Sequence, residues 1–116
     1  DDDLLVYRMA GLTQRDVGAL YTYDAFSPLV WFVLERFGFC GPGEAAKWTQ
    51  GGRIELGGEL PMNTSGGLLS EAHVSGWNSI VELVRQLRGE AGPRQVPDIQ
   101  VAQWATAWGD SLIFRR

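Results

Sequence analysis

Residues 60–76 read Leu60-Pro-Met-Asn-Thr-Ser-Gly-Gly-Leu-Leu-Ser-Glu-Ala-His-Val-Ser-Gly76, and they include the chain's only histidine. The apolar beginning, residues 60–63, predicts a short strand, and the Ser-Gly-Gly that follows predicts a tight turn. After His73, apolar residues recur at helical spacing, which predicts an amphipathic helix over about Ser75–Leu87 that ends at Gly89. This order of strand, glycine turn and helix predicts that the histidine lies at the edge of a sheet.

Helices and strands alternate on both sides of this stretch. That order predicts a layered α/β fold, formed by a single domain over residues 1–116. The helix beginning near Pro28 is apolar nearly all round, so we expect it to be well buried. The helix over residues 75–87 should carry Glu82, Arg85 and Arg88 on its outer face. We expect helices over 4–9, 28–37 and 44–50, a buried strand over 19–23, and a terminal hairpin of strands over 101–107 and 111–114.

The composition argues against several classes of function. With a net charge of −4 over 116 residues, the chain has no basic stripe to neutralise phosphates, so we expect no nucleic-acid partner. We expect no membrane span, because no apolar run approaches the roughly 18–20 residues that one needs. Asp1-Asp-Asp3 is unlike a signal peptide and is typical of an exposed end. The single cysteine, Cys40, excludes a disulfide framework, and no Cys/His cluster has metal spacing, so we expect no metal and a cytoplasmic location.

The first candidate site lies in the stretch that begins with Asn63. Its two glycines, Gly66 and Gly67, would allow a ligand to approach the backbone closely. A histidine ahead of a long helix can act as a general acid/base or donate to a developing oxyanion, and His73 has that position. The alternative is a half-buried histidine that only satisfies a loop carbonyl. Glu71, two residues earlier, could orient the ring or could be a solvated surface carboxylate.

Tyr23 and Asp24 form the second candidate, at the end of the first predicted strand. A phenol there points into the region where α/β sheets bind ligands, although a structural core tyrosine is the alternative. Tyr21, two residues earlier, should face the same side and have the structural role. Asp24 could accept from backbone N–H groups at the start of the following helix. Cys40 has no local cationic environment, which favours a structural thiol over a nucleophile.

Four segments together resemble a known family. They resemble the C-terminal half of a thiolase, and more narrowly the sterol-carrier-protein/lipid-transfer-protein branch of that superfamily. The resemblance implies an α/β fold with a mixed sheet and packed helices that is N-terminally incomplete. The segments are Tyr23-Asp-Ala-Phe26, Phe37-Gly-Phe-Cys-Gly-Pro-Gly-Glu44, Leu60-Pro-Met-Asn-Thr-Ser-Gly-Gly-Leu-Leu-Ser-Glu-Ala-His73 and Val84-Arg-Gln-Leu-Arg-Gly89.

The resemblance also implies roles for individual residues. Tyr23 stands where thiolases have the Asn of Asn-Glu-Ala-Phe, which holds a water of the oxyanion hole. His73 falls on the catalytic histidine of Gly-His-Pro, while the segment 104–109 lacks the cysteine of the thiolase Cys-x-Gly motif. The residues expected to form the oxyanion or substrate loop are Asn63, Ser65, Gly66, Gly67 and Asp24.

The Tyr-Asp-Ala-Phe form resembles the steroid side-chain aldolases of this branch. It implies retro-aldol cleavage of a β-hydroxyacyl-CoA in lipid or steroid catabolism, with no cofactor beyond the coenzyme A carried by the substrate. The expected partners are an N-terminal thiolase half, a small OB-fold acyl-CoA-binding protein, and a second copy of the full subunit in a homodimer. This half is not expected to be active alone. Two alternatives stay open: a non-catalytic subunit that completes a partner's fold or carries a lipid acyl-CoA, and an acyltransferase whose cysteine lies elsewhere.

Overall fold

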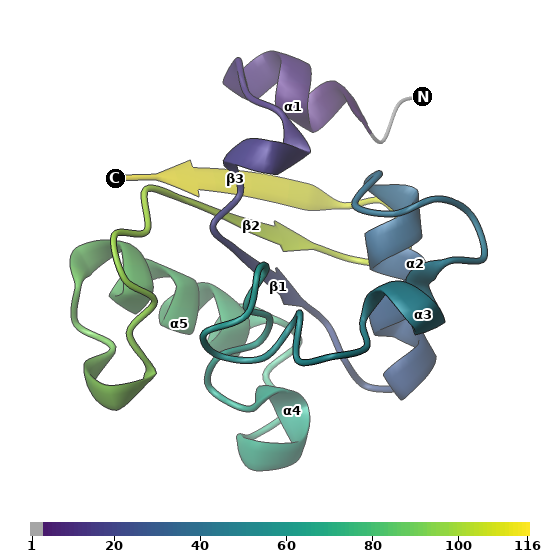
Figure 1. The fold of residues 1–116 in the computed structure, drawn as a ribbon. Helices are drawn as coiled ribbons and strands as arrows, with labels where there is room; N and C mark the ends of the chain where they lie inside the picture. The colour runs from purple at the N-terminus through teal and green to yellow at the C-terminus, as the bar shows by residue number, and fades with distance from the viewer. Residues whose placement is uncertain (1–3) are drawn as a thin grey trace.

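The computed structural model describes residues 4–116. They form a small mixed sheet that lies between two layers of helices (Figure 1). The expected exposed end at residues 1–3 lies outside the described residues. Helices α1 (Leu5–Ala10), α2 (Ser27–Arg36) and α3 (Ala45–Trp48) belong to the layer on one face of the sheet, and α5 (Trp77–Arg88) covers the other. Strand alternation produces the two cores, because Leu20 packs into the first and Tyr21 into the second.

The sheet has the order β1-β2-β3. Strand β1 (Ala19–Thr22) pairs in parallel with β2 (Val101–Ala105), and β2 pairs antiparallel with β3 (Ser111–Arg115). Every residue of β1 is buried, which is expected of a strand covered by helices on both faces. The layered α/β fold and the terminal hairpin predicted from the sequence are therefore confirmed.

The strand predicted over residues 60–63 is reduced to one parallel bridge, between Leu20 and Met62. The Leu20 N–H donates to the Pro61 carbonyl at 3.0 Å, and the Asn63 N–H donates to the Leu20 carbonyl at 3.2 Å. Asn63 then takes a positive φ of 43°, which turns the chain out of the sheet direction. The prediction of a strand was wrong, but the segment does lie beside β1.

Glycine ends two of the helices, and the sequence predicts the second of these ends, at Gly89. Gly11 follows α1 with φ 67°, and Gly89 follows α5 with φ 73°, both in the left-handed conformation that favours glycine at a helix end. Pro28 lies in the first turn of α2, where its missing N–H costs no helical hydrogen bond.

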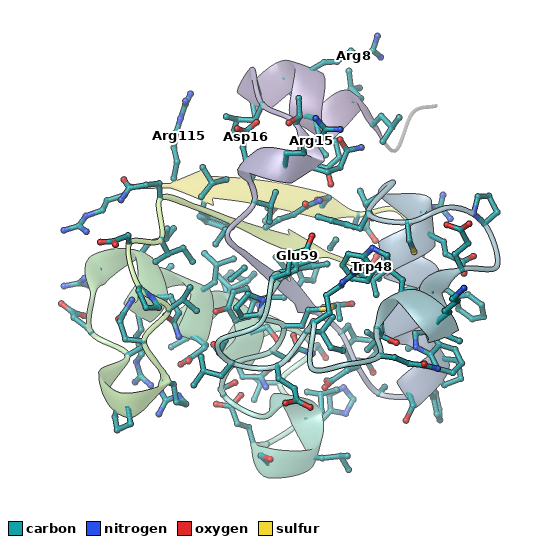
Figure 2. All side chains as sticks on the ribbon, viewed as in Figure 1. Arg8, Arg15, Asp16, Trp48, Glu59 and Arg115 are labelled. Atoms are coloured by element: carbon teal, nitrogen blue, oxygen red, sulfur yellow. The ribbon has the colours of Figure 1, made fainter. Side chains whose placement is uncertain are left out.

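Arg53 stabilises the turns of the glycine-rich segment that lies between α3 and the Leu20–Met62 bridge. The Arg53 guanidinium lies over the Trp48 ring, 4.7 Å from its centroid, and pairs with Glu59 at 3.1 Å. Figure 2 shows Trp48 and Glu59 close to one another on this side of the molecule. The Arg53 carbonyl also accepts from the Leu60 N–H at 2.9 Å, which directs the chain back toward β1.

Two predictions about exposure were wrong. Helix α2 buries only the face with Val33 and Leu34, while Trp31 is 42% and Phe32 56% exposed, because one side of the helix meets the sheet and the other lies at the surface. Glu82 is not on the outer face of α5 but is 1% exposed. It is buried because Arg94, which lies 12 residues later in the turn after α5, supplies a matching cation.

Candidate active site

The structure brings the two candidate catalytic residues together. Tyr23 directly follows β1, and His73 lies between α4 (Gly67–Ser70) and α5. The Tyr23 Oη and His73 Nε2 atoms are 3.0 Å apart, and the two ring centroids are 5.5 Å apart. A phenol and an imidazole at this distance can pass a proton directly between them.

An indole from the β2–β3 turn adjoins this pair. The Trp108 ring centroid lies 6.0 Å from that of Tyr23, and its side chain is 63% exposed. The sequence did not identify Trp108 as a neighbour of this pair. The contact depends on the parallel pairing of β1 with β2, which brings the carboxyl ends of the two strands to the same sheet edge and which no local sequence pattern shows.

The side-chain amide of Asn63 continues the sheet's hydrogen bonding at Thr22, the residue before Tyr23. Its Oδ1 accepts from the Thr22 N–H at 2.9 Å, and its Nδ2 donates to the Thr22 carbonyl at 3.2 Å. The side chain thus takes the place of a neighbouring strand's backbone. This geometry fixes the exit of β1, and the role of Asn63 toward substrate stays a prediction.

Asp24 caps a different helix from the one predicted. Its Oδ1 accepts from the Leu68 N–H at 3.0 Å, in α4, whereas α2 has Phe26 at its N-cap position and no side-chain cap. Gly67 is buried with φ 68°, and a Cβ there would overlap the Asp24 carboxylate. The close approach that this glycine allows is therefore made by Asp24 from within the protein.

The other loop positions are Ser65 and Gly66. The Ser65 hydroxyl donates to Glu71 Oε2 at 3.0 Å, so its oxygen already serves an internal contact. Gly66 is exposed with φ 99°, and its N–H donates to the Asn63 carbonyl at 2.8 Å. Glu71 binds Ser65 and Asn78 rather than the His73 ring. The predicted substrate-loop roles of Ser65 and Gly66 stay predictions.

A buried polar network under this loop was missed by sequence reasoning. Glu82 accepts from Arg94 at 2.9 and 3.0 Å and from Thr64 at 3.0 Å, and Gln86 donates to Thr64 at 3.1 Å. Since the Thr64 hydrogen goes to Glu82, Tyr21 donates to Thr64, at 2.8 Å. No local pattern marks such a network, because its members are far apart in the sequence.

The network shifts two pKa values. Burial alone would raise the pKa of Glu82, but hydrogen bonds from Arg94 and Thr64, with the Arg94 charge, hold it below its ordinary value. Burial raises the pKa of Tyr21 to about 12, against a smaller lowering by the Thr64 hydrogen bond. Tyr21 therefore has the structural role that the sequence predicted, with its proton retained.

Cys40 has the environment of a structural thiol. Burial raises its pKa, as do the negative charges of Glu35 and Glu44, and the side chain packs against the core on the α2 face. A nucleophilic cysteine needs the opposite shift. Within residues 4–116, no group of three His, Cys, Asp or Glu side chains could hold a metal ion. No helix in that range is long and apolar enough to cross a membrane.

Residues 5–113 match the family model described as thiolase C-terminal domain-like, so the chain belongs to that family. It is 50% identical over 84 residues to the 17-hydroxy-3-oxo-4-pregnene-20-carboxyl-CoA lyase of Mycobacterium tuberculosis, a match that covers 72% of this chain and 22% of the relative. Over 84 residues it is 49% identical to a steroid side-chain-cleaving aldolase of Thermomonospora curvata, with the same coverage.

More distant relatives include human sterol carrier protein 2, which is 39% identical over 99 residues, 83% of this chain and 18% of the relative. Among solved structures, the Ltp2-ChsH2(DUF35) aldolase matches with a TM-score of 0.90 at 40% identity, covering 97% of this chain and 30% of that one. The chain therefore spans about a fifth of the length of these three curated relatives. The resemblance to the thiolase superfamily and its sterol-carrier branch is confirmed.

Proposed function

We propose that this chain supplies the acid/base side of an active site that cleaves a β-hydroxyacyl-CoA of the steroid side-chain type by a retro-aldol reaction. The observation that carries the proposal is the 3.0 Å contact between Tyr23 Oη and His73 Nε2 at the carboxyl end of β1. The names of two relatives, a pregnene-carboxyl-CoA lyase and a steroid side-chain-cleaving aldolase, support the reaction class.

The reaction divides into two proton transfers around one bond cleavage. A base takes the proton of the β-hydroxyl, whose oxygen then forms a carbonyl with the β-carbon. The bond between the α- and β-carbons breaks, the ketone or aldehyde leaves, and the electron pair of the broken bond forms a thioester enolate. Tyr23 acts as the base in its phenolate form, or as a relay that takes the β-hydroxyl proton while it passes its own proton to His73 Nε2. His73 then either stabilises the enolate by donating a hydrogen bond to its oxygen or protonates the α-carbon, and it is the protonation of the α-carbon that completes the shorter acyl-CoA.

The exposure of His73 favours a site that residues outside this chain complete. We infer that two partners cover the Tyr23–His73 pair and hold the substrate: an N-terminal thiolase half and a small OB-fold acyl-CoA-binding protein. We infer also that the full subunit forms a homodimer. Coenzyme A enters as part of the substrate, and the reaction requires no further cofactor.

The raised pKa of Cys40 favours aldol cleavage over acyl transfer as the reaction of this site. It is the only cysteine of the chain, and its raised pKa disfavours the thiolate that acyl transfer needs. An acyltransferase would need a cysteine from another part of the protein. The third candidate is a non-catalytic subunit that binds a lipid acyl-CoA without cleaving it.

The test is cleavage of a steroid β-hydroxyacyl-CoA by the assembled protein that contains this chain. Tyr23→Phe and His73→Gln should each lower kcat by about 10²–10⁴-fold, because each removes a proton-transfer group. Tyr21→Phe is the matched control: it removes a hydroxyl two residues away that serves only the Thr64 network, so kcat should stay within a few-fold.

Three other outcomes contradict the proposal. Unchanged cleavage in both Tyr23→Phe and His73→Gln would remove the pair from the mechanism. Acyl transfer from a β-ketoacyl-CoA to coenzyme A, without cleavage of the β-hydroxyacyl-CoA, would favour the acyltransferase. Binding of acyl-CoA with neither reaction would favour the non-catalytic subunit.

A further inference from the structure

His73 lies in an exposed segment whose side chains are not buried against the rest of the protein. Residues 69–75 are all exposed, and residues 72–74 form neither helix nor strand. Exposed segments of this kind open at low cost in free energy. Proton transfer nevertheless requires the ring to stay within about 0.5 Å of its productive position. Something other than burial must therefore restrain the backbone that carries His73.

Glu71 supplies such a restraint. Its Oε2 atom accepts from Ser65 Oγ and from Asn78 Nδ2, each at 3.0 Å. Ser65 belongs to the loop that leaves the bridge beside β1, and Asn78 lies in the first turn of α5. One carboxylate oxygen thus joins anchors on both sides of the segment that contains His73.

The two anchors are themselves fixed. Next to Ser65, the Thr64 hydroxyl donates to the buried Glu82, and Asn63 is bonded to the end of β1 through its amide. Asn78 is half-buried, and its amide must turn its NH₂ group toward Glu71, since a carboxylate can only accept. The Glu71 contacts therefore tie the exposed segment to the same framework that positions Tyr23.

We propose that Glu71 is a positioning residue that holds His73 at hydrogen-bond distance from Tyr23, and does not itself exchange protons with the substrate. This inference rests on the proposed function for its kinetic effect, but its structural claim is independent of the reaction. The competing role is that of a general base, which would use the charge of Glu71 rather than its acceptor oxygen.

Substitutions separate the two roles because an amide keeps the acceptor but loses the charge. In the assembled protein, Glu71→Ala should lower kcat about tenfold with KM within about twofold, since the ring is misplaced after the substrate has bound. Glu71→Gln should stay within about threefold of the unmodified protein, because its amide oxygen can accept from both anchors. Glu90→Ala is the control, as it removes an exposed carboxylate just beyond the C-terminal end of α5 that pairs with Arg88.

Exchanging the hydrogen-bond donor and acceptor between positions 71 and 78 gives a stricter test. Asn78→Asp places two carboxylates against each other and should match Glu71→Ala. The double variant Glu71→Gln/Asn78→Asp restores one donor and one acceptor, so kcat should recover to within about threefold. Recovery of this kind requires the contact itself and is not expected from a general effect on stability.

The imidazole resonance of His73, assigned by its absence in His73→Gln, gives a readout without substrate. Glu71→Ala and Asn78→Asp should shift or broaden it, and Glu71→Gln and the double variant should restore it. If the protein shows no aldol cleavage, the proposed function fails while this measurement still decides the positioning role. A loss in Glu71→Gln as large as in Glu71→Ala, or an unchanged resonance in Glu71→Ala, would overturn the inference.

Discussion

At Gly67 the backbone has a φ of 68° and a carboxylate occupies the space that a side chain would fill. The carboxylate is that of Asp24, which accepts from the next N–H, that of Leu68, at 3.0 Å. This contact joins the residue after Tyr23 to the short helix before His73. Glycine is needed here for two independent reasons, its left-handed conformation and the close approach.

Gly67→Ala should therefore destabilise the protein by about 3 kcal/mol, combining roughly 1 kcal/mol of backbone strain with a steric overlap. Gly89→Ala is the matched control, because Gly89 has φ 73° but nothing beyond its chain neighbours lies within 4 Å of the added carbon, so it should lose only about 1 kcal/mol. Urea unfolding of the two variants measures the difference. Equal losses would show that Asp24 moves aside without cost.

Helix α5 is rotated relative to the orientation that its sequence predicts. Leu83 and Leu87 face the sheet as expected, while Val81 and Val84 are at the surface and Glu82 faces inward. Apolar periodicity alone could not select this rotation. The Arg94 guanidinium selects it, because its two hydrogen bonds compensate the burial of the carboxylate.

The Glu82–Arg94 pair should make the free energy of unfolding depend on pH in the acid range. The pKa of Glu82 is lower in the folded protein than its ordinary value of 4.5, so the unfolded chain binds more protons as the pH falls. The contribution is present above about pH 4.5 and is lost as the pH falls through the folded pKa. Glu82→Gln should cost about 2 kcal/mol at pH 7, less than for a fully buried pair because Arg94 is partly exposed, and should flatten the acid slope.

The control is Asp16, an exposed carboxylate whose pKa is lowered by hydrogen bonds from the Thr13 backbone and hydroxyl. Asp16→Asn should leave most of the acid slope in place. Thermal unfolding from pH 3 to pH 7 compares the two variants. A slope that is unchanged in Glu82→Gln would assign the acid dependence to other carboxylates.

The whole molecule combines a rigid sheet with an exposed active-site segment. The two cores cover both faces of β1 and the paired part of β2, where Leu20, Tyr21 and Ala102 are fully buried. Residues 69–75 contribute no buried side chain. Tyr23 therefore projects from the stable part of the protein, and His73 from a part that tertiary hydrogen bonds must restrain.

Amide hydrogen exchange should follow this division. The amides of β1 and β2 should exchange slowest, near the rate set by global unfolding, and those of residues 72–75 should exchange at least about 10³-fold faster. Mass spectrometry of the peptides that cover residues 19–22 and 69–76 measures both. Equal protection of the two segments would show that an unseen contact covers the loop.

Much of the fold could be predicted because its signals are local. Glycine after Arg88 and proline at the start of α2 each act within a few positions, so these helix ends, the buried strand β1 and the terminal hairpin were predicted close to their observed places, unlike the strand expected over residues 60–63. The pairing of Tyr23 with His73 came from the family resemblance, since the two residues are 50 positions apart.

By itself the sequence determined the main helices, the buried strand and the terminal hairpin, the helix end at Gly89, and the family to which the chain belongs. Tertiary structure alone decided that Asp24 caps α4, that Glu82 faces Arg94, and that Glu71 links Ser65 to Asn78. Periodicity and capping depend on neighbours along the chain. Those polar contacts depend instead on how α5 and the loop after Met62 pack against β1, which no local pattern encodes.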